Sequence, residues 1–112
     1  MESVQTDDEY EDELRVMHEM FPNAMFEIDI PLSELNDVIT DANNIIVTHT
    51  LCNCRINTWN RTTHYYISGN KMTNKYVINE LIKQGLDLDC DHFFLEGFRQ
   101  ISKTQFELVI GS

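Results

Sequence analysis

The sequence has few of the features that mark membrane-spanning, secreted or disulfide-stabilised proteins. No run of apolar residues comes near the roughly 20 that cross a bilayer, and the N-terminus is acidic where a secretory signal is basic and then apolar. Three cysteines are an odd number, which favours free thiols over a disulfide framework. Only two prolines and four glycines occur among 112 residues, of which 42% are hydrophobic. We therefore expect one folded, soluble domain without a membrane partner, in the cytoplasm or nucleus.

Acidic residues are abundant in the chain but absent from its middle. Residues 1–41 carry 13 of the 19 Asp and Glu and a single base, Arg15, so their net charge is −12. Residues 42–79 carry no acid and four bases. We expect residues 1–22 to form an acidic N-terminal arm with a short helix, and residues 23–112 to form an α+β domain.

The arm contains a stripe of apolar residues at helical spacing. Tyr10, Leu14, Met17 and Phe21 follow one another at i, i+4, i+7 and i+11, acids lie at the start of the segment, and Pro22 ends it. This pattern predicts an acidic amphipathic helix. Its apolar stripe needs cover from this chain or from another, so the four residues are candidates for a partner interface.

The remaining segments predict an αββαββ body after this helix. Helical spacing covers residues 32–39 and 72–83, with Gly85 placed to end the second helix. β-branched and aromatic runs predict strands at 45–51, 63–67, 93–101 and 105–110, the last two joined as a hairpin. The fold class is α+β: one domain with a largely antiparallel four-stranded sheet and helices packed on it. Alternation places Leu95 and Phe98 on opposite faces, so both sides of the sheet need cover.

Cysteine and histidine residues form a candidate metal site. In Cys52-Asn53-Cys54 and Cys90-Asp91-His92 the outer residues share a face of an extended segment. Together they would offer three thiolates and an imidazole, which is a ligand set for structural zinc. The single residue between ligands is too short for common zinc modules, and small buried hydrophobic cysteines explain the same pattern.

A second weak candidate is a nucleic-acid site in the acid-free middle. Arg55, Trp59, Arg61 and Tyr65 combine basic and aromatic side chains, as in proteins that bind single strands by stacking. The net charge of −11 opposes approach to a polyanion. Nucleic acid is therefore not the partner that we favour.

No catalytic motif stands out. The four glycines form no phosphate-binding loop and no nucleophile elbow, and a Cys and His pair by itself shows no catalytic geometry. An enzyme is left open, with a non-enzymatic protein favoured. We expect no cofactor, zinc being the one alternative.

The most distinctive motifs lie in the C-terminal half. They are Tyr76 to Ile82 (YVINELI), His92 to Phe98 (HFFLEGF) and Thr104 to Leu108 (TQFEL), followed by Gly111-Ser112. Over roughly residues 31–112 the chain resembles small uncharacterised proteins of amoeba-infecting giant DNA viruses, of the marseillevirus and mimivirus type. The resemblance implies a viral protein in the host cytoplasm or nucleus during infection or in the virion, with viral or host proteins as further partners. It implies no activity and no site residues.

These patterns favour a non-enzymatic interaction or structural protein that forms a homodimer. The apolar back of the sheet or the helix with Tyr10, Leu14, Met17 and Phe21 would form the contact, because a small domain gains core by pairing. The alternatives are a metal-binding protein or enzyme that uses the Cys and His residues, and a nucleic-acid-binding module in the middle segment.

Overall fold

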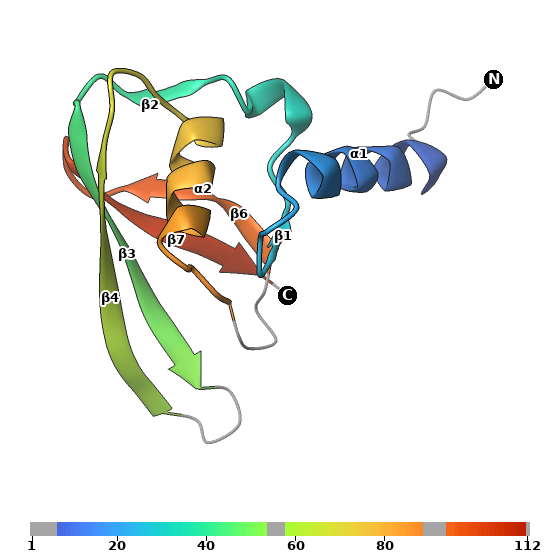
Figure 1. The fold of residues 1–112 in the computed structure, drawn as a ribbon. Coiled ribbons are helices and arrows are strands. Elements are labelled where there is room, and N and C mark those ends of the chain that lie inside the picture. Colours follow the sequence, from blue (N-terminus) through green and yellow to red (C-terminus); the bar gives the residue numbers. More distant parts are fainter. Residues whose placement is uncertain (1–6, 54–57, 89–93, 112) are drawn as a thin grey trace.

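The computed structural model describes residues 7–53, 58–88 and 94–111. Two helices and seven strands are defined over these residues (Figure 1). In chain order they are α1 (Asp7–Met20), β1 (Glu27–Ile28), the 3-10 turn η1 (Leu32–Glu34), β2 (Val38–Thr40), β3 (Asn44–Asn53), β4 (Thr58–Ser68), β5 (Met72–Thr73), α2 (Asn74–Lys83), β6 (Phe94–Gln100) and β7 (Gln105–Gly111). Neither described helix is long and apolar enough to cross a membrane.

Five strands form one curled, mixed sheet in the order β1-β6-β7-β3-β4. The hairpins β3–β4 and β6–β7 are antiparallel, whereas β1 runs parallel to β6 and β3 parallel to β7. The sheet curves around α2 as an open half-barrel (Figure 1). The α+β class, the four longer strands and the hairpin of β6 with β7 are confirmed. The prediction of a four-stranded, largely antiparallel sheet is wrong, because two parallel pairings and the short β1 make it five-stranded and mixed.

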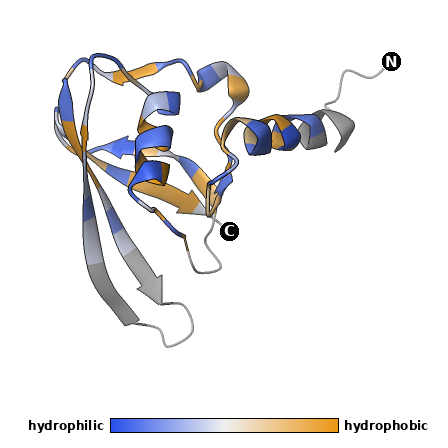
Figure 2. Ribbon diagram, in the orientation of Figure 1, coloured by the Kyte–Doolittle hydropathy of each residue, from blue (hydrophilic) through white to orange (hydrophobic). Residues whose placement is uncertain are grey.

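The core lies between the inner face of this sheet and α2. Val77, Ile78 and Leu81 of the helix are fully buried against a cluster that includes Val47 and Phe106 of the sheet. In Figure 2 hydrophobic residues are coloured orange along parts of α2 and of the sheet. Because the polypeptide places apolar side chains at every second strand position and on one helix stripe, these two elements bury each other.

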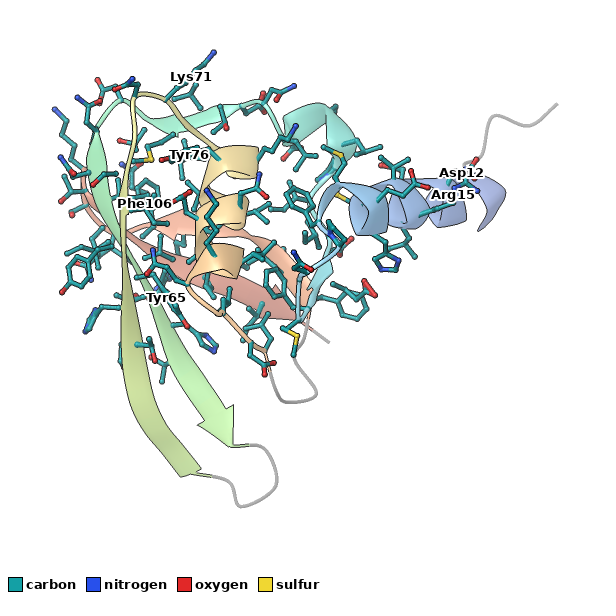
Figure 3. The ribbon with its side chains drawn as sticks, in the orientation of Figure 1. Asp12, Arg15, Tyr65, Lys71, Tyr76 and Phe106 are labelled. Atoms are coloured by element: carbon teal, nitrogen blue, oxygen red, sulfur yellow. The ribbon has the colours of Figure 1, made fainter. Side chains whose placement is uncertain are left out.

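The amphipathic helix predicted in the arm is α1. Met17 and Phe21 are only 4% and 3% exposed and belong to the core of the domain. The opposite end of α1 points away from the sheet, where Asp12 and Arg15 form an exposed ion pair (Figure 3). The chain itself therefore covers the C-terminal half of the apolar stripe.

The prediction of a helix at residues 32–39 is wrong. Only the single turn η1 forms there, followed by β2, which pairs with β5 in a separate two-stranded sheet. Val38, Ile39 and Thr40 are β-branched and favour an extended backbone. A hydrogen bond links this segment to the first residue of α2: the Asn74 side-chain amide donates to the carbonyl of Glu34 at 2.8 Å.

The helix predicted at 72–83 is α2, which begins two residues later. Thr73 caps it by accepting a hydrogen bond from the backbone N–H of Tyr76 at 3.1 Å. Gly85 has a φ of +86° just beyond the helix, which is the conformation that makes glycine favourable at this place. The two residues before the helix, Met72 and Thr73, are β5.

The back of the sheet is less apolar than the sequence predicts. The register of β6 shifts at a bulge between Leu95 and Gly97, so Leu95 and Phe98 do not take opposite faces. Leu95 is fully buried, and Phe98 packs partly against the same core. The prediction that both faces need apolar cover is therefore wrong at these positions.

Candidate functional site

The long strand β4 lies at one edge of the five-stranded sheet. It pairs along its length with β3, from Ser68 opposite Asn44 to Thr58 opposite Asn53, and is the last strand in the sheet order (Figure 1). An edge strand leaves every second pair of backbone N–H and C=O groups without a strand partner. In a strand of 11 residues this edge is a place where another strand can bind.

At the C-terminal end of β4, side chains in and next to α2 occupy two outward carbonyls of this edge. The side chain of Gln84 donates to the carbonyl of Tyr66 at 2.9 Å, and the hydroxyl of Tyr76 donates to the carbonyl of Ser68. In Figure 3 the labelled Tyr76 lies on the side of α2 that faces the β3–β4 hairpin. Both carbonyls therefore point away from β3.

Toward the N-terminal end of β4, a bulge interrupts the regular pairing with β3. The register shifts between Leu51 and Cys52, which pair with Arg61 and Trp59, so Asn60 interrupts the alternation. Between this bulge and the two carbonyls held by α2, alternation turns the backbone groups of Thr62 and His64 outward. Neither backbone makes a hydrogen bond with another described residue. The free edge, as we call residues Thr62–Tyr66 from here on, is thus bounded on both sides.

Side chains beside the free edge form a mixed outer face. Tyr66 is 69% exposed and lies opposite Ile46 on β3. A shallow groove of about 420 Å³ is lined at this end of the hairpin by Asn44, Ile45, Ile46, Tyr66, Ile67, Ser68 and Thr104. Further along, Thr62 and Thr50 are cross-strand neighbours whose hydroxyls lie 3.1 Å apart.

One row of residues crosses the whole outer face. His64 on β4 lies opposite Thr48 on β3, Thr48 lies opposite Glu107 on β7, and Glu107 lies opposite Arg99 on β6. Arg99 forms an ion pair with Glu107. The row therefore begins with the exposed imidazole of His64 at the free edge and ends in the ion pair of Glu107 with Arg99.

On the inner face of the hairpin, His49 is buried. The residue is 7% exposed, and its Nε2 atom has no hydrogen-bond partner among the described residues. Burial lowers the pKa of this imidazole, because removal from water disfavours the charged form. His49 is therefore a neutral buried side chain at neutral pH.

The predicted zinc ligands lie mainly outside the described residues. Cys54, Cys90 and His92 belong to this group, and the structure describes the backbone of Cys52 but not its side chain. Within the ranges that the structure describes, no group of three or more His, Cys, Asp or Glu side chains is placed to hold a metal ion. The zinc site stays a prediction.

The predicted nucleic-acid residues are only partly visible. Arg55 is outside the described residues, as are the side chains of Trp59 and Arg61. Tyr65 is half-buried on the inner face, where burial and the nearby Asp87 carboxylate raise its pKa. Tyr65 packs partly against the core. The nucleic-acid site stays a prediction.

The residues of the predicted interface stripe differ in how far they are buried. Met17 and Phe21 lie in the core, Leu14 is partly exposed, and the side chain of Tyr10 is not described. Leu14 and Met17 line a shallow groove of about 300 Å³ together with Glu13 and residues 28–31. A contact through this stripe stays a prediction for Leu14 and Tyr10.

Sequence reasoning missed the free edge. The run Thr58 to Ser68 predicts a strand by its β-branched and aromatic residues, but the neighbours of that strand depend on pairings with distant segments. Its lack of acids does not identify an edge, because buried strands also lack charged residues. Comparison with protein-family models, curated proteins and solved structures finds no match to the chain.

Proposed function

We propose that this protein is a non-enzymatic interaction protein that acts as a homodimer, and that two copies join through antiparallel pairing of their β4 edges. The observation that carries the proposal is the free edge, where the outward backbone groups of Thr62 and His64 have no hydrogen-bond partner among the described residues. Main-chain hydrogen bonds across such an edge supply affinity, and the side chains beside it supply specificity.

Charge favours this edge over the opposite one. β4 contains no acid, so two copies bring no carboxylates together there. The opposite edge of the sheet is the two-residue β1, which contains Glu27 and is followed by Asp29. Repulsion between carboxylates and the short length of β1 both disfavour pairing of two copies at that edge.

The setting of this role follows from the sequence resemblance alone. We propose that the dimer acts as a viral protein in the host cytoplasm or nucleus, or in the virion. The alternative functions centred on Cys54, Cys90 and His92 concern residues outside the described ranges, and no described contact favours them.

The test compares two threonines that differ only in their distance from the edge. Thr62 lies on β4, and its neighbour Thr50 lies one strand further in. Both side chains are exposed, and both lose the same mutual hydroxyl contact when either is replaced. Sedimentation velocity at pH 7.5 should show a dimer for the wild type and for Thr50→Glu, and a dissociation constant at least about tenfold higher for Thr62→Glu, since an edge carboxylate blocks strand pairing.

Two results would overturn the proposal. One is a wild-type monomer at high micromolar concentration. The other is an equal effect of both glutamates on association, because only Thr62 borders the partner strand. Far-UV circular dichroism of the two variants verifies that each one keeps the fold.

A further inference from the structure

We propose that the two-fold axis of the dimer passes beside Thr63. In this register Thr62 of each copy pairs with His64 of the other, and the two Thr63 residues lie opposite each other. The inference rests on the proposed function and specifies which residues of the same edge meet. The partner is a second copy of this chain, whose β4 continues the sheet, so that two five-stranded sheets join into one.

The backbone groups that β4 offers to a partner belong to two residues. Alternation turns every second residue away from β3, and the outward carbonyls of Tyr66 and Ser68 show that these are the even-numbered residues. Both of these carbonyls already accept hydrogen bonds from side chains in and next to α2, and Asn60 lies at the bulge. Thr62 and His64 remain, and their backbone groups have no hydrogen-bond partner among the described residues.

These two residues are complementary to themselves across a two-fold axis. In an antiparallel pair, opposite residues whose groups face each other exchange both of their N–H···O hydrogen bonds. When Thr62 lies opposite the His64 of the other copy, symmetry repeats the pair, and every free N–H and C=O of both residues is used. Thr63 is midway between them and therefore lies opposite itself. Its own backbone groups face β3, where its partner is His49.

The two ends of the edge agree with this register. Asn60 and Tyr66 lie equally far from Thr63 in the sequence, so the register sets Asn60 of one copy opposite Tyr66 of the other. Asn60 interrupts regular pairing, and the Tyr66 carbonyl already accepts from the side chain beyond α2 at 2.9 Å. The two unsuitable positions therefore meet each other, and pairing ends there on both sides. An axis beside Thr62 would set the bulge opposite His64, and an axis beside His64 would set the bonded Tyr66 opposite Thr62.

The side chains at these positions are compatible with the contact. Thr62, Thr63 and His64 are all exposed, so none of them has to leave the core when the strands pair. Thr62 and His64 lie on the outer face of the sheet, and Thr63 lies on the same face as His49. Threonine favours strands, and two threonines directly opposite each other in an antiparallel pair stabilise it. Since β4 contains no acid, the contact brings no carboxylates together.

Disulfide formation between single introduced cysteines measures this register in the full chain. The two Thr63 residues would form a non-hydrogen-bonded antiparallel pair, whose Cα atoms are about 4.5 Å apart and within the span of a disulfide. Thr63→Cys should therefore link the two copies in oxidised glutathione. Thr62→Cys and His64→Cys are matched controls on the same strand, because each would lie about 7–8 Å from its symmetry mate. We expect Thr63→Cys to link at least about tenfold faster than either control.

Two readouts identify the contact. Trypsin releases residues 62–71, which contain no native cysteine, so mass spectrometry of a disulfide-linked pair of this peptide is specific for the introduced thiol. Amide hydrogen exchange of the wild type, followed by NMR, needs no substitution. The N–H groups of Thr62 and His64 should exchange more slowly above the dissociation constant of the dimer than below it, whereas that of Tyr66 should not change.

The outcomes separate the inference from the proposed function. A wild-type dimer in which Thr62→Cys or His64→Cys links as fast as Thr63→Cys would overturn the register and leave the dimer standing. Protection of the Tyr66 N–H in the dimer would do the same, because it places the axis beside His64. A dimer in which the N–H groups of Thr62 and His64 stay unprotected would also refute the inference. A wild-type monomer at high micromolar concentration in sedimentation velocity would remove the proposed function as well.

Discussion

The buried His49 should make the stability of this domain depend on pH. Its Nε2 atom has no partner among the described residues, and burial lowers the pKa of the ring below its ordinary value of 6.5. In the unfolded chain the ring titrates near that ordinary value. The unfolded state therefore binds more protons than the folded state once the pH falls below about 6.5, and the free energy of unfolding decreases as the pH falls.

The loss in the free energy of unfolding depends on how far the pH falls below 6.5. One group that is protonated only in the unfolded state changes the free energy of unfolding by at most about 1.4 kcal/mol for each pH unit. Between pH 7.5 and 5.5 about one unit lies below 6.5, so the loss from His49 has an upper limit of about 1.4 kcal/mol. The unpartnered nitrogen carries a further desolvation cost of roughly 1–3 kcal/mol at every pH.

Two substitutions separate these effects. His49→Leu removes both the titration and the buried nitrogen, so its free energy of unfolding at pH 7.5 should exceed that of the wild type by about 1 kcal/mol or more. His49→Gln removes only the titration and should share the flatter pH dependence without this gain. Urea denaturation at pH 7.5 and 5.5, followed by circular dichroism, measures all three proteins. The reasoning is refuted if His49→Leu loses stability between the two pH values as steeply as the wild type does.

Three further predictions concern contacts around α2 and the hairpin. Gly69→Ala should lower the free energy of unfolding by about 1–2 kcal/mol in urea titrations, because its Cβ would lie 2.7 Å from the ring of Tyr76 and displace it; an unchanged midpoint would contradict this. Asp87→Asn should lower the pKa of Tyr65 in a pH titration followed by NMR and leave the part of the shift that comes from burial, whereas no movement would exclude the carboxylate as a cause. Thr73→Ala should cost about 1 kcal/mol through loss of the helix cap, with Thr73→Ser near the wild type in thermal denaturation; equal melting of both variants would count against the cap.

Much of the fold could be predicted from local patterns. The helix α1, the four longer strands, the β6–β7 hairpin and α2 each follow from a hydrophobic period or a turn signal within a short segment. Gly85 and Pro22 mark ends because their backbone restrictions act locally. These elements need no information about distant neighbours.

Two errors share one cause. Residues 32–39 have helical spacing, but pairing of β2 with β5 keeps Val38 and its neighbours extended. Leu95 and Phe98 alternate in sequence, but a bulge sets the register of β6 against β7. In both cases pairing with a neighbouring strand outweighs a local preference of a few tenths of a kcal/mol per residue.

The candidate site shows the same division. From the sequence alone, the segment of β4 is a strand without acids and the N-terminal arm is acidic. Only the tertiary structure decided that β4 is an edge, that Tyr66 and Ser68 are held by α2, and that His49 is buried while His64 is exposed. The physical reason is that alternation within a strand assigns side chains to two faces, whereas the neighbour of each strand and the cover of each face depend on segments far away in the chain.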